Sequence, residues 1–146
     1  MATSRPDTLP RSASTGRARS TACPSRRSAT NTRREGTRAE RRALWHYRLR
    51  GYRVLGTNVW AGGNELDLVV RRGRRLVFVE VKSKSDEAHG DPLEMVGPEK
   101  RRRLGRAARA YLAAHPELGA LDCSFDVVAV RRSTVERVGA AFEPGW

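Results

Sequence analysis

The sequence predicts an α/β fold in which a mixed β-sheet carries flanking helices, in the order α-β-β-β-α-β(-β). Two stretches have apolar residues at helical spacing, and several short stretches are rich in β-branched and aromatic residues. Short turns separate the first three expected strands, which indicates an antiparallel meander. The second helix then returns the chain to the sheet for one or two further strands.

Turn residues and periodicity set the expected boundaries. The first helix is expected at residues 37–50, because its apolar residues form one stripe and Gly51 is well placed to end it. The second helix is expected to begin at Pro98, a residue that suits a first helical turn, after a loop at 83–97. The expected strands are residues 52–58, 65–71, 75–82 and 125–130, with a short additional strand at 135–138.

Charge is unevenly distributed along the chain. It has 146 residues, with 29 Lys and Arg against 16 Asp and Glu, a formal net charge of +13. Residues 1–34 have no hydrophobic period and are rich in Arg, Ser and Thr, so we expect a disordered basic tail before one folded domain at 35–146. The positive excess favours a polyanionic partner, although a strong preference for Arg over Lys is also typical of a GC-rich genome. The position of the charge is therefore more informative than its amount.

Several classes of protein are disfavoured. Cys23 and Cys123 lack any CxxC or Cys/His ligand spacing, so neither a zinc site nor a disulfide framework is indicated. No apolar run approaches the length of a membrane span, and the N-terminus lacks the apolar core of a secretory signal. A cytoplasmic location is the simplest expectation, while the Arg- and Ser-rich start also fits an organellar transit peptide.

Charged residues interrupt two expected strands that a tight turn joins. Asp67 lies among apolar residues in one strand, and Glu80 and Lys82 share one face of the next. Glu65 shares a strand face with Asp67 in the same way. Charges in central strands are costly unless they are paired or bind a metal, and carboxylates suit a hard cation such as Mg²⁺. The pattern therefore predicts either a metal site with a catalytic lysine or a structural ion pair of Lys82 with one of the two acids.

Glu40 lies in the expected first helix, near its apolar stripe. From there its carboxylate could point back towards the sheet and reach a bound ion through water. The alternative is structural, because Thr37-x-x-Glu40 matches a capping box in which the glutamate closes the start of the helix. The local sequence alone favours the cap.

The second helix carries a basic face. Arg102, Arg106 and Arg109 follow one another at i, i+4 and i+7, away from the apolar stripe, and Lys100 precedes them. Such a ridge suits a phosphate backbone, and the ordinary alternative is a solvated helix face. Few aromatic residues are available for base stacking, so we expect recognition through the backbone and through shape.

A series of short motifs runs through the folded part in order. They are Gly36-x-x-x-Glu40-x-x-Ala43, Gly51-Tyr52-x-Val54-Leu55 with Asn58, Glu65-Leu66-Asp67-Leu68, Val77-Phe78-Val79-Glu80-Val81-Lys82, Gly90, Lys100-x-x-x-Leu104-x-x-Ala107-Ala108-x-x-Tyr111-Leu112 and Phe125-Asp126-Val127-Val128-Ala129-Val130. With them the chain resembles the YraN-like family of small bacterial proteins. That family belongs by resemblance to the PD-(D/E)XK (restriction-endonuclease-like) nuclease superfamily and is similar to archaeal Holliday-junction resolvases. Asn64 and Lys84 depart from the family pattern, which usually has Gly and often has Arg at these positions.

The resemblance implies a restriction-endonuclease-like fold, with residues 35–146 as a nuclease-like domain. It also implies site roles, which are metal binding for Asp67 and Glu80, catalysis for Lys82 and Glu40, an additional acid at Glu65, and a phosphate contact for Lys100. With these roles, we expect the carbonyl of Val81 to complete the metal site and the ridge of Arg102, Arg106 and Arg109 to contact nucleic acid. The implied cofactor is Mg²⁺ or Mn²⁺, and the implied activity is endonucleolytic hydrolysis of DNA, including branched or single-stranded DNA. The alternative is a non-catalytic nucleic-acid-binding module on the same fold. The expected partner is nucleic acid and not a membrane, and a homodimer stays open.

Overall fold

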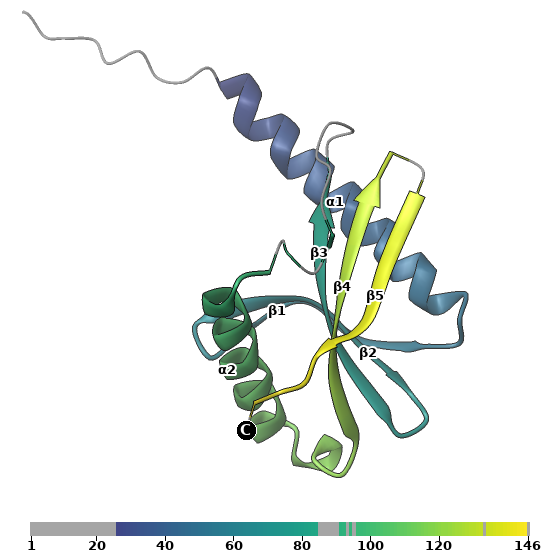
Figure 1. The fold of residues 1–146 in the computed structure, drawn as a ribbon, viewed down its shortest axis with the longest axis vertical. Helices are drawn as coiled ribbons and strands as arrows, with labels where there is room; N and C mark the ends of the chain where they lie inside the picture. The colour runs from purple at the N-terminus through teal and green to yellow at the C-terminus, as the bar shows by residue number, and fades with distance from the viewer. Residues whose placement is uncertain (1–25, 85–90, 93, 95, 133, 146) are drawn as a thin grey trace, which may run out of the picture.

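The protein is built on one five-stranded sheet with a helix on each face (Figure 1). A computed structural model describes residues 26–84, 91, 92, 94, 96–132 and 134–145, with side chains from residue 37 onward. The elements are α1 (Arg26–Arg48), β1 (Arg53–Ala61), β2 (Asn64–Arg72), β3 (Arg75–Ser83), α2 (Pro98–Ala114), a 3-10 turn (Pro116–Leu118), β4 (Asp122–Arg131) and β5 (Thr134–Phe142). This order confirms the predicted α/β layout.

The strands lie in the sheet in the same order as in the chain, β1-β2-β3-β4-β5. The pairs β1–β2 and β2–β3 are antiparallel, which confirms the predicted meander. Helix α2 connects β3 to β4, and these two strands are parallel, as a crossover connection allows. Strand β5 pairs antiparallel with β4 and extends well beyond the short strand expected at 135–138.

Helix α1 ends where the sequence predicted and begins earlier. Gly51 has φ +80°, its N–H donates to the carbonyl of Arg48, and the N–H of Tyr52 donates to the carbonyl of Tyr47, which is a Schellman ending. The helix begins at Arg26, so Thr37 lies inside it and cannot cap it. The capping-box interpretation of Glu40 was therefore wrong. Of the disordered tail expected at 1–34, residues 26–34 instead belong to α1. Residues 1–25, with Cys23, and the motif residue Gly90 lie outside the described residues.

Each face of the sheet has its own hydrophobic core. Ala43 and Tyr47 of α1 pack with Val79 and other strand residues on one face. Leu104 of α2 packs with Phe78 and its neighbours on the other face. The central strands are therefore covered on both sides, and any charged side chain in them is largely removed from water. In the described part of the chain, no helix is long and apolar enough to cross a membrane.

A buried carboxylate ties α1 to the outer strand β5. Asp126 of β4 is only 1% exposed. Its Oδ2 accepts hydrogen bonds from the Tyr47 hydroxyl at 2.6 Å and from Arg137 Nε at 2.7 Å. Its Oδ1 accepts from the N–H of Ala140 at 2.9 Å, beside a shift in the β4–β5 register. All three donors would lose their buried acceptor if this carboxylate were removed.

Gly105 in the middle of α2 is expected to be replaceable by alanine with a gain in stability. A Cβ at this position would meet no heavy atom within 4 Å. Because glycine is a poor helix former, Gly105→Ala should raise the free energy of unfolding by roughly 0.5–1 kcal/mol in urea denaturation. Gly62→Ala is the matched control and should destabilise, since Gly62 has φ +54° and its Cβ would lie 2.8 Å from the Arg106 carbonyl oxygen. A loss of stability in Gly105→Ala would contradict the expectation that the added methyl group meets no neighbouring atom.

Candidate active site

Strands β2 and β3 separate from each other at the predicted acidic cluster. Their pairing runs from the turn up to Leu68 opposite Val79 and goes no further. Beyond that point β2 stays paired with β1, whereas β3 stays paired with β4. Asp67 and Glu80 are the next residues on the two strands, so they lie at the mouth of this fork.

Asp67 fills the fork with its carboxylate. Its Oδ2 accepts a hydrogen bond from the backbone N–H of Val81 at 2.8 Å. The N–H and C=O of one strand residue point to the same side, so the carbonyl of Val81 also faces the fork. Asp67 and the carbonyl of Val81 therefore offer oxygen atoms to the same space.

Glu80 is buried and only half satisfied. Its side chain is 4% exposed, and its Oε1 lies 2.7 Å from Lys82 Nζ and 3.3 Å from Lys100 Nζ. Its Oε2 is also buried and has no hydrogen-bond partner among the described residues. A buried carboxylate oxygen without a donor is costly, and a bound cation would satisfy it.

The structural alternative was an ion pair of Lys82 with either Asp67 or Glu80, and the structure contains the pair with Glu80. Lys82 pairs with Glu80, and Lys100 of α2 reaches the same oxygen. No ion pair joins Lys82 to Asp67 among the residues that the structure describes. The two lysines therefore compensate Glu80, while Asp67 has a backbone N–H as its hydrogen-bond donor and no ion pair with a described residue.

The electrostatics of the fork follow from this arrangement. Burial, and then the charge of Glu80, raise the pKa of Asp67 from 3.8 to about 7, against the opposing effects of the Val81 N–H and the Lys100 ammonium. Glu40 adds a smaller upward contribution to the same pKa, because its negative charge also disfavours ionisation of Asp67. The fork therefore favours positive charge, either as a proton or as a metal ion.

Glu40 is held by a residue to which the sequence analysis assigned no role. Asn58 Nδ2 donates to Glu40 Oε2 at 3.3 Å. Asn58 lies between the β1–β2 pairs Thr57–Leu68 and Val59–Leu66, and is therefore opposite Asp67. Its φ of +49° is a left-handed conformation, which asparagine tolerates better than most residues. A polar amide directly before the apolar pair Val59-Trp60 was the signal that could have identified it.

Glu65, the additional acid expected at the site, lies apart from the acidic cluster. Glu65 is exposed and lies opposite Trp60 in the β1–β2 ladder, with no contact to the acidic cluster in the described part of the chain. Across the described ranges, no group of three or more His, Cys, Asp or Glu side chains is arranged to hold one ion. A metal in the fork would therefore rest on two carboxylates and a carbonyl, with water or substrate oxygens completing its shell.

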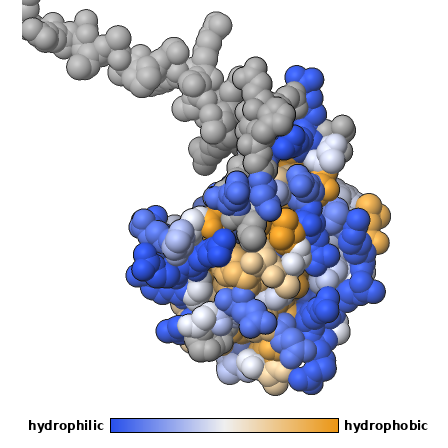
Figure 2. Space-filling view, in the orientation of Figure 1, coloured by the Kyte–Doolittle hydropathy of each residue, from blue (hydrophilic) through white to orange (hydrophobic). Residues whose placement is uncertain are grey.

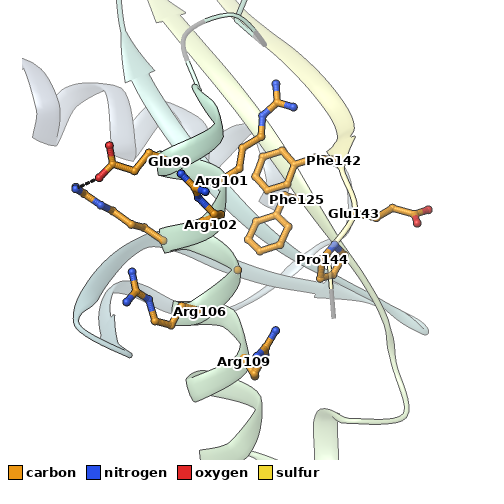
Figure 3. A pocket seen from close by; sticks show the side chains of 12 residues that line it. Glu99, Arg101, Arg102, Arg106, Arg109, Phe125, Phe142, Glu143 and Pro144 are labelled. Carbon is orange, nitrogen blue, oxygen red and sulfur yellow. Dashed lines mark hydrogen bonds and ion pairs between the residues drawn. The ribbon is translucent and has the colours of Figure 1, made fainter.

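The three arginines of the predicted ridge line one groove. Arg102, Arg106 and Arg109 lie along α2 and line a groove of about 610 Å³, which Phe142 and Pro144, at and after the end of β5, also line (Figure 3). Lys100, which the sequence analysis grouped with them, instead contacts Glu80. The three arginines therefore share one surface of α2, whereas Lys100 belongs to the acidic cluster.

The comparison with known proteins decides the family. The model of "Uncharacterised protein family UPF0102" matches residues 39–130. The chain belongs to the UPF0102 family. This membership confirms the resemblance to the YraN-like family, and the matched range runs from α1 to β4, so it includes both the fork and the ridge. It does not include β5 or the segment after it.

Individual UPF0102 relatives align over most of their own length or a large part of it. A UPF0102 protein of Paracidovorax citrulli is 42% identical over 120 residues, which are 80% of this chain and 87% of the relative. One of Xanthomonas oryzae pv. oryzae is 45% identical over 100 residues, which are 68% of this chain and 80% of the relative. One of Xanthomonas campestris pv. campestris is 50% identical over 78 residues, which are 53% of this chain and 64% of the relative.

The raised pKa of Asp67 predicts how the stability of the UPF0102 chain depends on pH in the absence of metal. Because the folded state holds this proton from pH 3.8 up to about 7 and the unfolded state does not, stability should fall as the pH rises through that window. Asp67→Asn removes the charge, so it should flatten this fall and leave the variant more stable by about 1–3 kcal/mol above the window. Urea denaturation with chelator at several pH values measures both effects. Asp67→Asn destabilised at every pH would contradict the repulsion described here.

Proposed function

We propose that the protein is a metal-dependent nuclease of the PD-(D/E)XK type, which hydrolyses phosphodiester bonds of nucleic acid, most simply DNA. The observation that carries the proposal is the fork between β2 and β3. There Glu80 has a buried oxygen with no hydrogen-bond donor among the described residues, and the Asp67 carboxylate accepts a backbone N–H, at adjoining positions of the two strands and beside two lysines. A binding protein for phosphate gains nothing from acids in that position.

The donor atoms of the fork fit a hard divalent cation. Mg²⁺ and Mn²⁺ prefer carboxylate, carbonyl and water oxygens, and here Asp67, Glu80 and the carbonyl of Val81 supply the protein's share. A bound ion would supply a positive charge that polarises a phosphate oxygen and lowers the pKa of water. It would also remove the repulsion that raises the pKa of Asp67.

The chain's own residues would do the remaining work. Lys82 lies at the edge of the fork with its ammonium 2.7 Å from Glu80, where it can orient an attacking water and offset charge on the phosphate. Lys100 brings a second ammonium from α2 to the same carboxylate and so links the basic helix to the reaction centre. Glu40, positioned by Asn58, would orient water on the side of β1.

A second candidate is a nucleic-acid-binding module that does not cleave. It is favoured by one observation, namely that the arginine-lined groove shares no lining residue with the acidic cluster and could bind phosphates on its own. In that case the Glu80–Lys82 pair would be structural, and removing metal would change nothing.

A cleavage assay separates the two candidates. The full chain is incubated with linear duplex, single-stranded, flapped and four-way DNA, each with Mg²⁺ or Mn²⁺ and each with chelator. The nuclease proposal expects strand breaks that require the metal. DNA binding without breaks on any substrate, in either metal, would leave the binding module.

A further inference from the structure

The groove beside α2 differs from an ordinary charged helix face because it has two walls. The arginines of α2 form one wall, and Phe142 and Pro144, at and after the end of β5, form the other (Figure 3). Phe142 stacks on the buried Phe125, with ring centroids 4.5 Å apart, so this wall is anchored in the core. In the view of Figure 2, apolar residues gather in the middle of the face and hydrophilic residues surround them.

The charge of the groove is strongly positive. Five arginines and two glutamates line it, and one of the glutamates, Glu99, is already paired with Arg103. No ion pair of Arg102 or Arg106 with an acid occurs in the described part of the chain. From Arg102 to Arg109 the helix rises about 10 Å, which is long enough to contact two or three successive phosphates of one strand.

The groove begins next to the acidic cluster. Lys100 contacts Glu80, and the following residue, Arg101, turns into the groove, where its guanidinium lies 5.5 Å from the centre of the Phe142 ring. Arg101 Nε also donates to the carbonyl of Val96 at 2.9 Å, which fixes the side chain at this end of the groove. A strand leaving the fork would therefore meet the groove within one turn of α2.

We propose that this groove binds a single nucleic-acid strand, so that the substrate class is nucleic acid with an unpaired segment rather than intact duplex. A single strand can enter between two walls, with its phosphates on the arginines and its sugars and base edges against Phe142 and Pro144. A duplex presents a convex surface and would contact only the rim. The claim about substrate rests on the proposed nuclease function, whereas strand binding in the groove needs no metal.

Gly105 allows the groove to be tested without damage to the helix. It lines the groove, and a Cβ there would meet no heavy atom within 4 Å. Gly105→Glu and Gly105→Gln therefore place side chains of equal length into the groove and differ only in charge. The double variant Arg102→Gln/Arg106→Gln removes two charges from the groove. Its matched control, Arg53→Gln/Arg75→Gln, removes two exposed charges at positions that do not line the groove.

The experiment is a fluorescence-anisotropy titration of the full chain with a labelled oligothymidylate, in chelator. Gly105→Glu should weaken binding by about tenfold relative to Gly105→Gln, and Arg102→Gln/Arg106→Gln by a similar factor relative to its control. Blunt duplex of equal length should compete poorly. Equal losses with the control variant, or no difference between Gly105→Glu and Gly105→Gln, would overturn the proposal.

Competition by the duplex and by an acidic peptide shows whether the groove binds something other than a single strand. Duplex that competes as well as single strand would overturn the unpaired-segment claim. A polyglutamate peptide that competes as well as the oligonucleotide would assign the groove to an acidic protein partner instead. Cleavage plays no part in these titrations, so their failure is distinct from a failure of the nuclease proposal.

Discussion

Asp67→Asn and Lys82→Ala should each reduce metal-dependent strand cleavage by at least about 100-fold while leaving the chain folded. Asp67→Asn removes one of two carboxylates at the fork, and Lys82→Ala removes the ammonium that lies 2.7 Å from Glu80. The rates are measured on whichever substrate the wild-type chain cleaves fastest. Thermal melting and DNA binding in chelator check that only chemistry has been lost.

Glu65→Gln is the matched control for these two variants. It removes a carboxylate two residues from Asp67 on the same strand, but from an exposed position without contact to the cluster in the described residues. Its cleavage rate should stay within about twofold of wild type. Equal losses in Glu65→Gln and Asp67→Asn would mean that general negative charge, and not the fork, is responsible.

Asp126→Ala should be the most destabilising single change considered for this protein. It leaves Arg137, the Tyr47 hydroxyl and the N–H of Ala140 without their buried acceptor. Breaking a buried pair typically costs about 3–5 kcal/mol, and partial exposure of Arg137 reduces this to about 2–4 kcal/mol of unfolding free energy. Urea denaturation measures the loss.

Tyr47→Phe provides the comparison for Asp126→Ala. It removes one donor and leaves the Asp126–Arg137 pair in place, so it should cost only about 1–2 kcal/mol. If Asp126→Ala costs no more than Tyr47→Phe, the carboxylate does not hold α1 to β5 in the way its contacts indicate.

The sheet could be predicted from the sequence because its central strands carry strong local signals. The runs from Leu66 and from Leu76 are β-branched and apolar, and the turn at Gly73 sets their register. The start of α1 was not predictable from apolar periodicity, because its first turns hold no apolar stripe. The length of β5 was underestimated for a similar reason, since small residues near its end give little strand signal.

The residues of the acidic cluster could be predicted from the sequence, but the hydrogen bonds and ion pairs among them could not. The tight turn between the two strands indicated that Asp67 and Glu80 are near one another, but the separation of β2 from β3 depends on the whole sheet. That separation decides that Lys82 pairs with Glu80 and that Asp67 receives the Val81 N–H. Lys100 of α2 contacts Glu80 of β3, and this contact could not be predicted because it depends on how α2 packs against the sheet.

Asp126 and the groove were missed because their partners are distant in the sequence. Asp126 lies in a run that reads as an apolar strand, and its donors come from α1 and β5. The arginines of α2 were recognised as a face, but the second wall is made by Phe142 and the residues after it. Helical spacing can identify a charged surface and cannot show what lies opposite it.

Calorimetric titration of the full chain with Mg²⁺, at a pH above the pKa of Asp67, is the sharpest test of a metal centre in the fork. The fork predicts one metal site that requires both carboxylates. Wild type and Glu65→Gln should therefore bind the ion, while Asp67→Asn and Glu80→Gln should not. No Mg²⁺ or Mn²⁺ binding by the wild type, or equal binding by Asp67→Asn, would contradict a metal centre between β2 and β3.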